Sequence, residues 1–266
     1  MKKIKFTLFF VLIVTLFGTT SSCEKPLNLF SVNDDIEFGK QFDQEIKNNR
    51  DFVILDEKQY AKAYQIINQY KSKLLATEKV DYFDKFSWTV RIIRDDNTVN
   101  AFAVPGGYLY FYTGLINILD NEAEFIGVLA HEMAHVARRH STAQLTKAYG
   151  IDLLLSLLLG KNSNQWVKIA SGLASGLLEL KFSRDDEFEA DKYAVRYTYV
   201  TDWDARGVAD FFKKMDSQKP IPTFLSTHPA DKDRIAAIIK EFEALGGVPG
   251  KTFEENYKIF IESLKN

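Results

Sequence analysis

The stretch VLAHEMAHVARRH, residues 128–140, contains three of the four histidines in this 266-residue chain. Its core, His131-Glu132-x-x-His135, is the H-E-x-x-H pattern, and residues four apart lie about 40° apart around a helix. Both imidazoles can therefore face one zinc ion, with Glu132 close enough to take a proton from a water molecule. The alternative is a pair of hydrogen-bonded histidines on a buried helix. Either way, the stretch requires a helix inside a packed domain.

His140 is the third histidine of the stretch, and the helical angle separates it from the other two. It follows His131 by nine residues, which is about 180° around one continuous helix. We expect that helix to span about 121–149, so His140 points away from the metal as a surface or second-layer residue. The longer pattern H-E-x-x-H-x-x-G-x-x-H is not met, because Arg138 and Ser141 occupy its last two defined positions.

A third metal ligand must come from another segment, and the acidic run KFSRDDEFEADKYA at 181–194 is the candidate. Glu187 and Asp191 are four residues apart on one helical face, whereas Glu189 lies across the helix and is expected to be solvated. One carboxylate on zinc with a second behind it is a common construction. An acidic run is also common on a solvent-facing surface, so the residues alone leave both interpretations open.

The rest of the chain predicts helices before and after a small sheet. Apolar residues alternate with polar ones at 87–93, and Pro105-Gly106-Gly107 separates two strands within 99–114, which indicates an antiparallel sheet. With 46% hydrophobic residues, the chain can bury a sizeable core, which favours one mostly helical α+β domain over residues 33–266. The expected helices span about 33–48, 57–75, 121–149, 151–160, 166–182, 184–200, 204–216, 230–244 and 253–264.

Residues 1–22 are typical of a secretory signal peptide. Three early lysines precede an apolar run at 6–17, and small polar residues follow. A retained membrane anchor is the alternative, but this apolar run is short for a bilayer span. We therefore expect export of the chain.

Cys23, the only cysteine, follows this segment directly and resembles the lipidation site of bacterial lipoproteins. Ser21 and Ser22 fit such a site, whereas Thr20 stands where an aliphatic residue is usual, so a soluble exported protein stays as an alternative. Residues 23–32 are expected to form a lipidated tether. Without the signal lysines, 31 basic residues face 36 acidic ones, and no basic stripe suggests nucleic acid. Contact with a membrane is expected through the lipid.

Four segments in order, NAFAVPGG, HEMAHVARRH, FSRDDEFEAD and STHP, resemble the zinc metallopeptidase family that includes HtpX, the CAAX prenyl proteases and periplasmic BepA-like quality-control proteases. The resemblance covers about residues 34–245 and implies a zincin-type metalloprotease domain with one Zn²⁺ per chain. The two zinc histidines, the third zinc ligand, the catalytic base and a second-shell carboxylate of this family fall on His131, His135, Glu187, Glu132 and Asp191, respectively.

The resemblance also singles out His228, within Ser226-Thr227-His228-Pro229. In BepA-like members, a histidine at this place lies near the metal, where it can stabilise the transition state or cap the zinc in a latent form. The simpler alternative is that this stretch only begins the next helix, with Pro229 in its first turn. Arg234 also falls in the family pattern, and both a salt bridge to a buried carboxylate and a substrate contact are open for it.

These residues predict peptide hydrolysis. Glu132 would take a proton from water and pass it to the leaving amine, and His228 could donate a hydrogen bond to the developing oxyanion. The strand at 99–104 offers an edge to which an extended polypeptide can add as another strand. The substrate-binding residues would then be Asn100, Ala101, Phe102 and Ala103, and the alternative for this strand is ordinary sheet core.

We expect the chain to act on unfolded or misassembled proteins of the bacterial cell envelope, as a lipoprotein that faces the periplasm. Envelope assembly machinery is a possible partner. The main rival is a latent, chaperone-like protein that binds polypeptides and cleaves them rarely. A purely structural zinc protein is a further rival, but such a site has no use for a base at Glu132.

Overall fold

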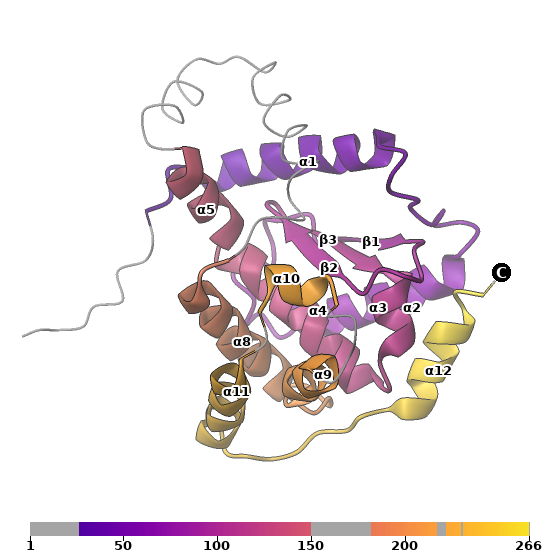
Figure 1. Ribbon diagram of the computed structural model, residues 1–266, viewed down its shortest axis with the longest axis vertical. Coiled ribbons are helices and arrows are strands. Elements are labelled where there is room, and N and C mark those ends of the chain that lie inside the picture. The colour runs from indigo at the N-terminus through magenta and orange to yellow at the C-terminus, as the bar shows by residue number, and fades with distance from the viewer. Residues whose placement is uncertain (1–26, 150–181, 217–221, 230, 266) are drawn as a thin grey trace, which may run out of the picture.

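Helices cover both faces of a three-stranded sheet in the computed structural model, which describes residues 27–149, 182–216, 222–229 and 231–265 (Figure 1). The expected signal peptide, Cys23 and most of the two apolar segments between 151 and 182 lie outside these residues. Within the described ranges, no helix has both the length and the apolar character that crossing a membrane requires.

The sheet contains β1 (Thr89–Ile93), β2 (Ala101–Val104) and β3 (Tyr108–Tyr112), in the spatial order β1-β3-β2. β2 and β3 pair antiparallel across a turn in which Gly106 and Gly107 have φ values of 76° and 93°, a region that favours glycine. β1 pairs parallel to β3, so the sheet is mixed and the prediction of an antiparallel sheet is wrong for β1. The turn residues determine only the β2–β3 hairpin, whereas packing decides the partner of β1. This order leaves β2 at an edge of the sheet.

The side chains of β3 alternate between two hydrophobic clusters, as the pleat of a strand requires. Leu109 and Phe111 belong to the larger cluster, which they share with α4 (Glu122–Ala137). The tyrosines of β3 belong to the smaller cluster, together with α1 (Val32–Asn48). The sheet is therefore a layer between α1 and α4 (Figure 1).

α4 is the central helix, and every one of its residues is buried. The other helices are α2 (Ala61–Leu75), α3 (Thr113–Ile118), α5 (His140–Tyr149), α8 (Arg184–Tyr199), α9 (Gly207–Asp216), α10 (Phe224–Thr227), α11 (Lys232–Ala244) and α12 (Glu254–Glu262). α8 and α9 pack against α4, α11 packs against α8 and α9, and α12 packs against α2. α3 and α10 were not predicted, because six and four residues are too few for apolar periodicity to show.

The described end of the expected tether lies along α5. The Asn28 amide donates to Thr142 Oγ1 at 2.9 Å, and the backbone N–H of Leu29 donates to Thr146 Oγ1 at 3.2 Å. Phe30 follows with its side chain buried in the smaller cluster. Residues 28–30 are therefore packed against the domain.

Candidate metal centre

α4 carries the H-E-x-x-H pattern through the middle of the core. Asn121 caps the helix by accepting a hydrogen bond from the backbone N–H of Glu124 at 3.0 Å, which satisfies one of its free N–H groups. One helical turn separates His131 from His135, both side chains are fully buried, and their Nε2 atoms lie 3.0 Å apart. The helix therefore presents two imidazoles to one point, as the spacing predicts.

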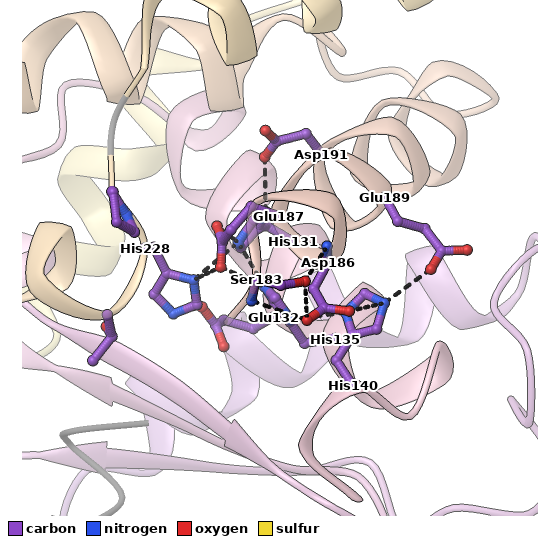
Figure 2. A network of polar contacts seen from close by, with 12 residues as sticks. His131, Glu132, His135, His140, Ser183, Asp186, Glu187, Glu189, Asp191 and His228 are labelled. Carbon is purple, nitrogen blue, oxygen red and sulfur yellow. Dashed lines mark hydrogen bonds and ion pairs between the residues drawn. The ribbon is translucent and has the colours of Figure 1, made fainter. Parts of the chain in front are cut away.

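α8 brings the acidic residues to the same point (Figure 2). Ser183 and Asp186 form a capping box that begins the helix, and Glu187 follows with its side chain 2% exposed. Oε2 of Glu187 lies 3.6 Å from His131 Nε2, and Oε1 lies 3.5 Å from His135 Nε2. The predicted pairing of H-E-x-x-H with Glu187 is present in space.

Asp191 lies one turn further along α8, on the same face, and is also buried. Its Oδ1 is 2.9 Å from His131 Nδ1, although the N–H bond is not well aligned with that oxygen. A carboxylate at this distance favours a hydrogen on Nδ1 of the imidazole, which leaves the lone pair on Nε2. The predicted position of Asp191, behind His131, agrees with this geometry.

Arg234 closes the site behind the two carboxylates. Its guanidinium donates to both oxygens of Asp191, at 2.7 and 2.8 Å, and a third nitrogen lies 2.8 Å from Glu187 Oε2. The side chain is 2% exposed, so these charges pair almost without water. Of the two alternatives for Arg234, the structure shows the salt bridge to buried carboxylates.

His228 enters the same cluster from the end of α10 (Figure 2). Its Nδ1 lies 2.9 Å from Glu187 Oε1 and 3.3 Å from His131 Nε2, and its Nε2 lies 3.6 Å from Glu132 Oε1. The simpler alternative, that this stretch only begins the next helix, is wrong, because α11 begins at Lys232 after a cap by Asp231. The residue thus ends one short helix and projects into the site.

Four side chains now offer one ligand atom each, and these atoms all lie within 4.8 Å of one another: His131, His135, Glu187 and His228. Two or three imidazole nitrogens and a carboxylate oxygen are a donor set typical of transition-metal sites in proteins. The group can therefore hold a metal ion.

The protonation states in the cluster suit metal binding. Burial works to raise the pKa of Glu187, but the imidazoles and Arg234 around it prevail and lower that pKa to about 2. Burial and the neighbouring imidazoles lower the pKa of His135 well below its usual value. An ionised carboxylate and a neutral imidazole are the forms that bind a metal.

Glu132 and His228 are shifted in the opposite direction. Burial raises the pKa of Glu132, and the nearby histidines offset this only in part. For His228, burial works to lower the pKa, but the carboxylates of Glu187 and Glu132 prevail and raise it. A carboxylate whose pKa is raised is a better proton acceptor, which is the property a general base needs.

The prediction that His140 points away from the site is wrong. α4 ends at Ala137, and Arg139 adopts a left-handed backbone with φ of 63°, so that His140 begins α5 on a new course. Its Nδ1 lies 3.0 Å from His135 Nδ1, and its side chain is 1% exposed. The second-layer position, named as one of two possibilities for this residue, is the one that the structure shows.

Glu189 is the other residue whose surroundings differ from the prediction. It was expected to be solvated, but its Oε2 lies 3.0 Å from His140 Nε2, and Arg138 donates to its Oε1 at 2.9 Å. Its side chain is 35% exposed. A single-helix model of residues 121–149 could not have placed His140 near α8, since no glycine marks the break at Arg139.

The four residues predicted to bind substrate are in β2 or directly before it. Asn100 is 1% exposed, and neither its side-chain oxygen nor its nitrogen has a hydrogen-bond partner among the described residues. Ala101 and Ala103 face the α4 cluster, whereas Phe102 stacks on Tyr110 on the α1 side, with ring centroids 4.6 Å apart. The sheet-core alternative therefore describes the side chains of β2. The place of this strand at the edge of the sheet is the feature that supports the substrate-binding prediction.

Comparison with known proteins finds relatives that are named as proteases. The chain is 32% identical over 168 residues to the mitochondrial metalloendopeptidase OMA1 of Saccharomyces cerevisiae, a match that covers 59% of this chain and 48% of the relative. It is 30% identical over 156 residues to the beta-barrel assembly-enhancing protease of Yersinia pestis, covering 53% of this chain and 32% of the relative. The chain thus spans less than half the length of these relatives.

The family model called peptidase family M48 matches residues 65–241. That range includes the sheet, α4, α8 and His228, and so every residue of the cluster. The motif resemblance to zinc metallopeptidases is confirmed, and the chain belongs to peptidase family M48.

Proposed function

We propose that this chain is a zinc-dependent endopeptidase that binds one Zn²⁺ through His131, His135 and Glu187. The observation that carries the proposal is the convergence of these three buried side chains on one point, with Glu132 beside them on the same helix. Two imidazoles, one carboxylate and one open position are the arrangement of catalytic zinc sites, as distinct from closed structural ones. A bound zinc ion would supply a Lewis acid for the scissile carbonyl and lower the pKa of water.

Glu132 is the proposed general base. Its side chain is 1% exposed, and its Oε1 has no hydrogen-bond partner among the described residues, so this oxygen is free to accept a proton from water. Burial raises the pKa of Glu132, which strengthens it as an acceptor. The same carboxyl group can then return the proton to the leaving amine.

His228 supports two roles. An imidazole 3.6 Å from Glu132 could donate to the oxyanion that develops on the scissile carbonyl. In the present arrangement, however, its Nδ1 lies 3.3 Å from His131 Nε2, within the group of ligand atoms. That position favours a latent state in which His228 takes the ligand position that substrate or water needs. A second candidate function, chaperone-like polypeptide binding with little proteolysis, rests on this observation.

The proposed substrate is an extended polypeptide that adds to the edge of β2. An edge strand offers backbone N–H and C=O groups to any sequence, which suits unfolded chains. The buried, unpaired amide of Asn100 at the start of this edge could donate to and accept from the substrate backbone.

The proposed setting is the bacterial cell envelope. The name of the Yersinia pestis relative refers to beta-barrel assembly, which supports a role in quality control of misassembled envelope proteins. We further propose export through the signal peptide at 1–22, a lipid anchor on Cys23 and a position facing the periplasm. Contacts with envelope assembly machinery belong to the same proposal.

Replacement of the base tests the enzyme directly. Glu132→Gln should retain zinc and lose cleavage of an unfolded protein by about 10²–10⁴-fold, the usual contribution of a general base. His228→Ala should speed cleavage if His228 holds the site latent, and slow it if His228 stabilises the oxyanion. If zinc is bound but neither wild type nor His228→Ala cleaves, the protease proposal fails. Prevention of aggregation by the same samples would then support the chaperone-like alternative.

A further inference from the structure

A chain of three polar side chains extends from the back of His135 to the surface of α8 (Figure 2). His135 Nδ1 lies 3.0 Å from His140 Nδ1, and His140 Nε2 lies 3.0 Å from Glu189 Oε2. Arg138 donates to the other oxygen of Glu189 at 2.9 Å. Each contact is within hydrogen-bond distance, and none of these residues except His135 belongs to the proposed zinc ligands.

Glu189, at the outer end of this series of hydrogen bonds, determines which atom donates in each of them. Glu189, paired with Arg138, is an acceptor only, so His140 Nε2 must carry the hydrogen between them. A neutral imidazole with hydrogen on Nε2 has its lone pair on Nδ1. His140 therefore accepts at Nδ1, and the hydrogen in the contact with His135 belongs to His135 Nδ1.

The hydrogen on His135 Nδ1 matters because the other ring nitrogen, Nε2, faces the cluster. With its hydrogen on Nδ1, His135 has its lone pair on Nε2, 3.5 Å from the carboxylate of Glu187. The opposite direction would place a hydrogen on Nε2, which lies only 3.0 Å from His131 Nε2, and that hydrogen would block coordination.

We propose that His140 is a positioning residue that holds His135 in the tautomer and orientation needed to bind zinc, with Glu189 fixing the tautomer of His140. The inference rests on the proposed function, because it concerns a ligand of the same metal site. His140 itself does not contact the ion. It acts one hydrogen bond behind the ligand, and Glu189 acts two hydrogen bonds behind it.

The break between α4 and α5 supports this role. Arg139 adopts φ of 63°, an unfavourable region for a residue with a side chain, and such strain persists only where surrounding contacts hold it. Its guanidinium donates to Asp35 and to the backbone carbonyl of Phe30. Because of this turn, His140 folds back behind His135 and does not continue around α4.

Two substitutions separate the acceptor function of His140 from its packing. Asparagine places its side-chain oxygen close to the position of the imidazole Nδ1, so His140→Asn keeps an acceptor for His135. Glutamine places its polar atoms near the position of Nε2, so His140→Gln keeps the contact to Glu189 and loses the acceptor. Zinc affinity of the full chain is measured for both by competition with a chelator. His140→Gln should weaken zinc binding about 10–100-fold, and His140→Asn by less than about tenfold.

A second readout needs no metal. Ring ¹⁵N shifts of the four histidines report which nitrogen is protonated, and metal-free wild type should show His135 with hydrogen on Nδ1. Equal zinc affinity of the Asn and Gln variants, whether both tight or both weak, would overturn the proposal. Hydrogen on His135 Nε2 in wild type would also overturn it, even if a variant did not fold. Absence of zinc binding by wild type would instead reject the proposed function.

Discussion

His131 and His135 are one turn apart on α4, yet the residues behind them differ in construction. The Asp191 support, made of Asp191 and Arg234, places a charged carboxylate directly against His131, and both side chains are 2% exposed or less. The His140 support, made of His140, Glu189 and Arg138, places an imidazole against His135. Its carboxylate lies one residue further out and is 35% exposed.

The difference lies in where each support holds its charge. Arg234 pairs with Asp191 and Glu187 where water has little access, so removal of one partner leaves another charge buried and uncompensated. Arg138 pairs with Glu189 and Asp81, whose side chains are 35% and 49% exposed, so water can replace a lost partner. We therefore expect the Asp191 support to couple the metal site to the stability of the fold, and the His140 support to act mainly on metal binding.

Replacing the two arginines should give the largest contrast. Arg234→Met should lower the free energy of unfolding by about 3–5 kcal/mol, the usual cost of breaking a buried ion pair. The same change at Arg138 should cost about 1 kcal/mol or less, as for partly exposed pairs. Denaturant unfolding of the metal-free proteins measures both values, with the Arg138→Met protein as the matched control. Similar losses from the two variants would contradict the comparison.

Replacing Asp191 should have the next largest effect, and it should appear in zinc affinity. Asp191→Asn keeps the shape of the side chain but removes the charge that lies 2.9 Å from His131 Nδ1. We expect zinc binding to weaken about 10–100-fold, because the carboxylate no longer favours hydrogen on that nitrogen. Chelator competition measures the change. Unchanged affinity would show that the carboxylate serves Arg234 alone.

The same contrast explains which parts of the site the sequence could predict. His131, His135, Glu187 and Asp191 lie on two helices, and in each helix the four-residue spacing determines the face. Spacing alone leaves the solvent-facing interpretation of the acidic run open, and the family motifs decide for Glu187. The position of Asp191 behind His131 was therefore predictable before any coordinates, whereas for Arg234 the sequence left a salt bridge and a substrate contact open.

The His140 support was not predictable in this way, because it depends on a break in the helix. Arg139 adopts the left-handed region without glycine, and its guanidinium is held by Asp35 and Phe30, more than 100 residues away in the chain. Local helix propensity depends on neighbouring residues in the sequence and cannot predict such a contact. The prediction of a fully antiparallel sheet was wrong for the same reason. The partner of β1 is a strand that does not follow it directly in the sequence, whereas the β2–β3 hairpin follows from its own turn.

Replacing Glu189 should have the smallest effect and gives the sharpest test of the comparison. Glu189→Gln is the same acid-to-amide change as Asp191→Asn, but it acts through His140 and in partial contact with water. A glutamine oxygen can still accept from His140 Nε2, so the direction of the hydrogens towards His135 is kept. Zinc affinity should fall by less than about tenfold. The two amide variants are measured side by side under the same chelator conditions. A loss at Glu189 as large as that at Asp191 would mean that the charge itself, and neither its burial nor its distance from the imidazole, governs how each histidine holds the metal.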